Sequence, residues 1–197
     1  QVIDELFLLL KNSTNGEHHA YDKYLESISV YFGAKNEERI NYVLSQFVEI
    51  DGEYKPMKML LYDYGFSRRK GKILATEEYF IGGLSKEEIE ELIRSKSDTH
   101  QEWLDRLEKY IYLRRARSEY EGEKSKERIA RQMKYDDDGT LSSVSEYTYN
   151  DSLKGRGRLD YVKSYDPNNP DEITTTNYMG RPGQEVTALI LNPGDIS

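Results

Sequence analysis

The sequence predicts an α+β protein with a mainly helical N-terminal two-thirds and an antiparallel β region at the C-terminus. Before Tyr135 the apolar residues recur at helical spacing. After Tyr135 the sequence consists of short runs rich in Tyr, Thr, Val and Ser, separated by turn residues. We therefore expect a helical region over 1–134 with an inserted β-hairpin at 54–81, and a β-rich region over 135–197. These regions form either two subdomains or one composite domain.

Three helices are expected before the hairpin. Residues 2–11 predict a short amphipathic helix, and residues 19–32 predict a second one that stops at Gly33. Asn36 is a suitable N-cap for the third helix. The apolar residues that would form one face of that third helix are Ile40, Val43, Leu44 and Phe47.

The hairpin follows a turn at Asp51-Gly52, where the apolar pattern changes from helical spacing to alternation. Its tip is expected between Ser67 and Lys72, and Gly82-Gly83 closes it.

A capping box predicts the start of the next helix at Ser85. The Ser85 hydroxyl and the Glu88 carboxylate can each bond a free backbone N–H of the first turn, while Leu84 and Ile89 can form a hydrophobic staple. Another helix is expected from Thr99, and it can extend to Met133, although Gly122 disfavours this. Residues 117–128 are so polar that they form either a solvated helix or a flexible joint.

The C-terminal strands are separated by clear turn signals. The predicted strands cover 141–149, 158–165, 173–178 and 186–191. Three short segments are similar to one another, and they begin at Tyr135-Asp136, Tyr149-Asn150 and Tyr165-Asp166. They resemble the Tyr-Asp hairpin repeats of large bacterial surface proteins, over a minor part of the chain and at irregular spacing, so no family is assigned from them.

Composition restricts the classes of function. The chain has 197 residues, 37% of them hydrophobic, and a formal net charge of −8, which argues against a globally basic nucleic-acid binder. It has no cysteine, so disulfides, thiolate metal sites and a cysteine nucleophile are excluded. Its 17 tyrosines suit strands and half-exposed surfaces. The longest apolar run, at 6–10, is too short to span a bilayer, and no feature indicates a compartment.

Two basic clusters are the candidate binding residues. The first, at the hairpin tip, contains Arg68, Arg69, Lys70 and Lys72, and the second contains Arg114, Arg115 and Arg117. Cations at a hairpin tip can contact phosphates, and flanking tyrosines can stack on bases. The same clusters can pair with acidic patches on a protein partner.

Carboxylates and histidines offer weaker candidates for metal chemistry. Asp51, Glu53 and Lys55 are the nearest approach to the carboxylate and lysine set of a metal-dependent nuclease, although Asp51-Gly52 is also an ordinary turn. The run at 136–138 could offer oxygens to Ca²⁺, but it lacks EF-hand spacing and also fits a turn. The histidine pair at 18–19 and the lone His100 have no metal-ligand spacing.

No catalytic motif is present, so the sequence favours a non-enzymatic protein-interaction or assembly module. A structural component of a phage or another large bacterial complex would have this profile, with a protein partner or a second copy bound and no cofactor. The first alternative is a nucleic-acid-binding accessory protein that uses the basic hairpin tip. The second alternative is a metal-dependent nuclease or hydrolase.

Overall fold

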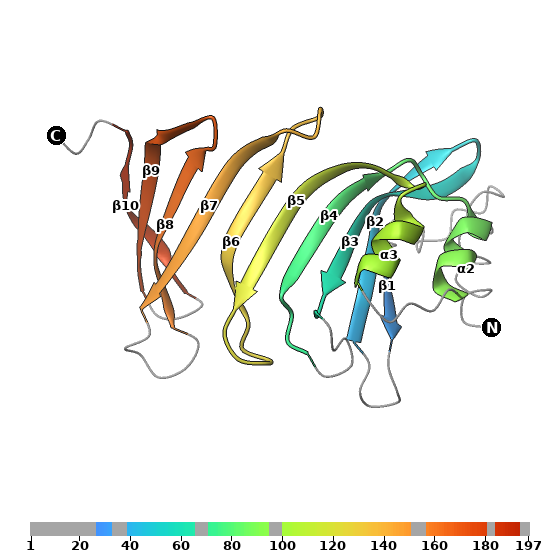
Figure 1. Cartoon of the computed structure of the whole chain (residues 1–197), viewed down its shortest axis with the longest axis horizontal. Helices are drawn as coiled ribbons and strands as arrows, with labels where there is room; N and C mark the ends of the chain where they lie inside the picture. The colour runs from blue at the N-terminus through green and yellow to red at the C-terminus, as the bar shows by residue number, and fades with distance from the viewer. Residues whose placement is uncertain are drawn as a thin grey trace, which may run out of the picture. The chain divides into compact units, whose positions relative to one another are not determined.

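The computed structural model describes residues 27–32, 39–65, 71–94, 100–150, 157–180 and 184–193. These residues form an antiparallel sheet of ten strands in which each strand neighbours the one before it in the chain (Figure 1). Two helices lie between the fourth and fifth strands in the sequence. The described part of the chain is therefore almost entirely antiparallel β-sheet.

The elements keep their chain order in the sheet. The strands are β1 (Ser27–Phe32), β2 (Arg39–Ile50), β3 (Glu53–Asp63), β4 (Ala75–Ile81), β5 (Ile111–Glu121), β6 (Arg128–Tyr135), β7 (Leu141–Asn150), β8 (Arg158–Asp166), β9 (Asn169–Met179) and β10 (Val186–Leu191). The helices are α2 (Lys86–Arg94) and α3 (His100–Leu107).

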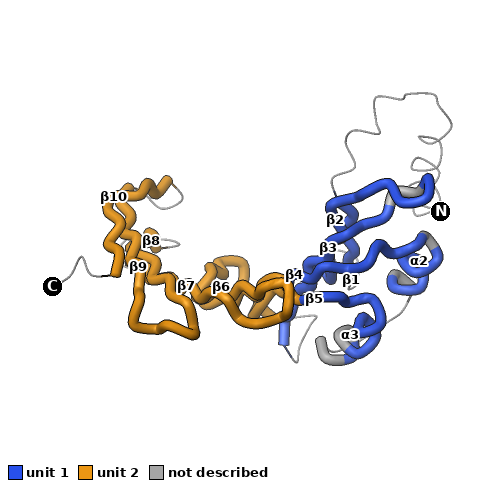
Figure 2. Tube along the Cα trace, turned by 90° about the horizontal axis from the view of Figure 1, so that it is seen from above, with its two compact units in different colours: residues 1–70, 78–113 blue, residues 71–77, 114–197 orange. Residues whose placement is uncertain are grey.

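The chain divides into two compact units (Figure 2). Unit 1 comprises 1–70 and 78–113, and unit 2 comprises 71–77 and 114–197. The division of the chain expected at Tyr135 falls at the β6–β7 turn, inside unit 2.

Unit 1 has a hydrophobic core between its strands and its two helices. Tyr42 and Leu44 from β2, together with Met59 from β3, are fully buried there. Ile89 from α2 and Leu107 from α3 belong to the same cluster. Alternate residues of a strand point to one face, so β2 and β3 present their apolar residues to the helices as a continuous surface.

Unit 2 is built differently, because every element in its described residues is a strand. Only a few of its apolar side chains are buried, chiefly Met133, Val144 and Val162. Polar contacts between neighbouring strands hold this part of the sheet together instead. The hydroxyls of Ser145 and Ser164 lie 2.8 Å apart, and the Tyr149 hydroxyl donates to the Ile129 carbonyl at 2.8 Å.

The predicted helical N-terminal region is wrong, and the protein is not α+β with a helical front. Residues 27–32 of the expected second helix form β1, and the expected third helix is β2. Gln46 has a φ of 55°, which interrupts strand alternation, so the apolar residues before and after it are spaced like those of a helix. The predicted helix at 2–11 lies outside the described residues.

The long helix expected from Thr99 towards Met133 is also wrong. Helix α3 ends at Leu107, and the remaining residues form β5 and β6. Gly122 has a φ of 102° in the turn between these strands. The polar stretch that suggested a solvated helix is therefore a hairpin with charged side chains at its surface.

Several local predictions are confirmed. The Ser85 backbone N–H donates to Glu88 at 2.8 Å and the Glu88 N–H donates to the Ser85 hydroxyl at 3.3 Å, which is the predicted capping box. The four C-terminal strands lie where the sequence placed them. The two strands expected at 54–81 are β3 and β4, which are neighbours within the larger sheet.

Candidate interaction surface

An exposed apolar surface lies on the last two strands of unit 2. We call it the apolar β9–β10 face, and it consists of Met179, Val186 and Leu189. Their exposed fractions are 55%, 60% and 52%, respectively. Single exposed apolar residues are common on protein surfaces, whereas a contiguous group of them marks a binding surface.

The strand register places these three side chains on the same face. Val186 is opposite Met179 and Leu189 is opposite Asn177, and directly opposed residues in an antiparallel pair share a face. Asn177 and Met179 are separated by an even interval along β9, so they share that face as well. Three apolar side chains that are separate in the sequence therefore form one patch, whereas Ile173 lies further along β9, where the register with β8 is irregular.

The opposite face of the same hairpin carries a different set of side chains. Thr187 is opposite Tyr178 and Ile190 is opposite Thr176. The register shifts between Thr187 and Leu189, and this irregularity places Leu189 on the apolar face and its neighbour Ile190 on the other. Leu189 and Ile190 are both 52% exposed, so they form a matched pair for experiments.

Strand β10 is also the last strand of the sheet. Among the described residues only β9 pairs with it, and none of its six residues is charged or proline. Natural edge strands are usually protected by such residues against association. The composition of β10 is therefore typical of a strand whose edge is shielded from solvent by another chain or segment.

The second basic cluster is engaged in ion pairs within unit 2. Glu77 is almost fully buried, and its Oε1 lies 2.7 Å from Arg117 and 3.3 Å from Arg114. Burial lowers the pKa of Arg117, but Glu77 and then Glu119 outweigh that effect and raise the pKa above its ordinary value. Two of the predicted phosphate-binding arginines are thus brought together around a buried carboxylate.

The remaining basic candidates are separate from this cluster. Arg115 forms an ion pair with Asp137 in the β6–β7 turn. The Lys72 ammonium group donates to the Gly122 carbonyl at 3.0 Å. Arg68, Arg69 and Lys70 lie outside the described residues.

Most of the carboxylate candidates belong to turns, whereas Glu53 begins strand β3. Asp51 and Gly52 have φ values of 55° and 77° and connect Ile50 directly to its partner Glu53, as in a two-residue hairpin turn. Asp138 accepts a hydrogen bond from the Thr140 N–H at 2.8 Å, which lowers the pKa of its carboxyl. Within the described ranges, no group of three or more carboxylates and histidines is arranged to hold a metal ion. The pair at 18–19 lies outside those ranges.

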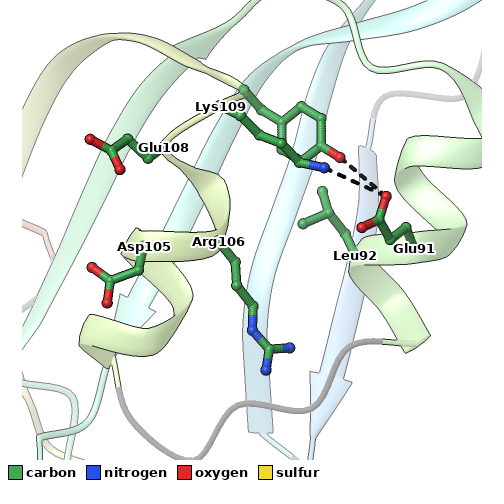
Figure 3. Close-up of a pocket in the computed structure, with 7 residues that line it drawn as sticks. Glu91, Leu92, Asp105, Arg106, Glu108 and Lys109 are labelled. Carbon is green, nitrogen blue, oxygen red and sulfur yellow. Dashed lines mark hydrogen bonds and ion pairs between the residues drawn. The ribbon is translucent and has the colours of Figure 1, made fainter.

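A hollow of about 440 Å³ lies beside the two helices of unit 1 (Figure 3). Tyr110 donates to Glu91 at 3.4 Å, and the Lys109 ammonium lies 3.6 Å from the same carboxylate. Asp105 and Glu108 point away from Glu91. The polar groups thus link α2 to the segment after α3 and do not converge on the hollow.

Neither the models of known protein families nor the curated proteins gave a match to this chain. The surface is therefore interpreted from its own geometry. Across the residues described by the structure, none of the helices combines the length and the apolar character needed to cross a membrane.

Sequence reasoning missed the apolar β9–β10 face, although a signal for it was present. Residues 186–191 contain one threonine and otherwise only aliphatic side chains. Such a run is typical of a strand that is covered on both faces. Combined with its position as the last predicted strand, it would have indicated a surface that requires a partner.

Proposed function

We propose that this protein is a non-enzymatic protein-interaction or assembly module that binds its partner through the apolar β9–β10 face. The observation that carries the proposal is the presence of three exposed, aliphatic or thioether side chains on one face of a sheet. Full burial of one such side chain contributes about 1.5–3 kcal/mol, so covering three half-exposed ones would contribute a few kcal/mol.

The ion pairs of the second basic cluster favour this choice over nucleic-acid binding through that cluster. Arg114 and Arg117 share Glu77, Arg117 also pairs with Glu119, and Arg115 pairs with Asp137. A phosphate backbone would have to compete with these ion pairs. No such competition exists at the apolar β9–β10 face, because its members carry no charge.

A photo-reactive cross-linking side chain can test the proposal in the cells that make the protein. It is introduced into the full chain at Leu189 or, as the matched control, at Ile190. We expect a protein cross-link from position 189 and much less from position 190, because only Leu189 belongs to the apolar face. Equal cross-linking from both positions, or none from either, would contradict the proposal.

A further inference from the structure

Charged residues on four neighbouring strands of unit 2 lie in one row across the sheet. The register places Glu119 opposite Arg131 and Arg131 opposite Glu146. Glu146 is in turn opposite Lys163. Directly opposed residues share a face, so the sign of the charge alternates from β5 to β8 along one face of the sheet. We call these four residues the charge row.

The opposite face of the same strands carries neutral residues, and they do not distinguish one register from another. Gln132 is opposite Ser145, and Ser145 is opposite Ser164, with 2.8 Å between the two serine hydroxyls. Ser143 has the same side chain as Ser145 and lies two residues before it on the same face. If β8 were displaced by two residues, Ser164 would again be opposite a serine.

The connection between β7 and β8 does not set their register either. Residues 151–157 separate these two strands, whereas only residues 167–168 separate β8 from β9. A tight turn fixes the register of its hairpin, and strands that are polar on both faces are prone to slip where no such turn is present. Every element in the described residues of unit 2 is a strand, so no helix packs on β7 and β8 there to select one alignment.

The charge row does distinguish the two registers. In the observed one, Glu146 accepts a hydrogen bond from the Tyr165 hydroxyl at 3.4 Å while it lies opposite Lys163. In the displaced one, Lys163 would be opposite Val144, which is buried, and Glu146 would be opposite Tyr161. Unlike charges on opposed residues stabilise the pairing of two strands, and like charges destabilise it.

From these observations, we infer that the charge row fixes the register of β7 against β8. It therefore selects one alignment in a part of the sheet where the opposite face and the connecting segment both allow another.

The test uses the absence of cysteine from the natural chain. Ser143→Cys, Ser145→Cys and Ser164→Cys are combined in the full chain, which is equilibrated in a glutathione buffer. Position 164 then forms a disulfide with position 145 in the observed register or with position 143 in the displaced one, because a disulfide requires Cβ atoms about 3.5–4.5 Å apart. Mass spectrometry of the digested chain measures the ratio of the two bonds, and we expect the 145–164 bond to dominate.

Reversal of one charge in the row should change that ratio. We expect Lys163→Glu to raise the 143–164 bond relative to the 145–164 bond by about threefold or more, because a like charge then lies opposite Glu146. Lys126→Glu is the control. Lys126 is an equally charged, exposed residue in the turn between β5 and β6, where it contacts Glu123, so its reversal should leave the ratio unchanged.

Salt provides a second measurement with a sign that depends on the variant. At about 1 M salt, charges are screened beyond about 3 Å. Salt should therefore raise the 143–164 bond when Lys163 is present, since it screens an attraction. It should lower that bond in Lys163→Glu, since it then screens a repulsion. If circular dichroism shows that Lys163→Glu does not fold, Lys163→Gln replaces it and should raise the 143–164 bond by a smaller factor.

Three results would overturn the inference. In the first, the 143–164 bond dominates while all four charges are intact. In the second, the ratio is unaffected both by loss of the Lys163 charge and by salt, which would show that the packing of Val144 and Val162 sets the register. In the third, Lys126→Glu changes the ratio as much as the variant of Lys163 does.

Discussion

At the scale of single residues, Glu77 is the most strongly constrained charged group in unit 2. Its side chain is 1% exposed and contacts Arg114 and Arg117. Removal of one member of such a cluster leaves the others without full compensation, which costs more than the intact interaction contributes.

We predict that Glu77→Gln lowers the free energy of unfolding by roughly 2 kcal/mol, because two arginines lose a charged acceptor. Denaturant unfolding monitored by circular dichroism measures the change. Glu119→Gln is the control, since Glu119 is 39% exposed and accepts at 3.2 Å from Arg117. A control variant that is destabilised as much as Glu77→Gln would show that burial of Glu77 is not the deciding factor.

Tyr149 gives a prediction for alkaline pH. Burial raises the pKa of its phenol from 10.0 to about 12, with Arg128 acting in the opposite direction. A folded pKa above the unfolded value favours the folded state fully below pH 10, and this contribution is lost as the pH rises towards 12. We expect ultraviolet titration to show a late phenolate step that Tyr149→Phe removes. A profile unchanged by that substitution would contradict the assignment.

At the scale of elements, the capping box explains why α2 begins where it does. We predict that Ser85→Ala costs about 0.5–2 kcal/mol of stability, because the Glu88 N–H loses its acceptor. Thermal or denaturant melts measure the loss. Glu88→Gln is the control, since glutamine can still accept from the Ser85 N–H. Association through the β9–β10 face should be unchanged in both variants.

The turn between β2 and β3 depends on positive φ at both of its residues. We predict that Gly52→Ala destabilises unit 1 by about 1 kcal/mol, because a Cβ disfavours that conformation. No atom lies within 4 Å of the added Cβ, so strain in the backbone is the only expected source. A neutral substitution in a denaturant melt would indicate that the turn adopts another conformation.

The elements differ in how well the sequence predicted them, because the prediction of each depends on its own turn residues and apolar spacing. Strands β7 to β10 were predicted because turn residues mark their ends. Strand β2 was mistaken for a helix because Gln46 breaks its alternation and leaves Leu44 and Phe47 three residues apart. Its content of β-branched and aromatic residues is typical of a strand, whereas the spacing of its apolar residues is typical of a helix.

The candidate surface was harder to predict than the strands that form it. The basic residues were predicted as binding residues because they cluster in the sequence. In the structure Arg114 and Arg117 instead contact the buried Glu77, which lies far away in the sequence. The apolar β9–β10 face depends on register, and the irregularity between Thr187 and Leu189 decides which side chain faces which way. Neither the distant partner nor the irregular register can be inferred from the order of the residues alone.

At the scale of the whole molecule, the two units should differ in local stability. Unit 1 buries an apolar cluster against its helices, whereas the strands of unit 2 bury few apolar side chains. We predict that amides of β9 and β10 exchange with solvent at least about tenfold faster than those of β2 and β3, in a purified sample without a partner. Hydrogen–deuterium exchange measures this, and equal protection in the two units would contradict it.

The order of the strands has a consequence for how the protein can change in length. Each described strand pairs with its predecessor, and β4 and β5 are the neighbours that have helices between them in the chain. Insertion or deletion of one complete hairpin would leave every other pair antiparallel and in the same order. During translation the sheet can form in the same order, because each new strand can pair with the strand made before it. Closing a short loop between two such strands costs little conformational entropy. Such a sheet is extensible by duplication, two strands at a time.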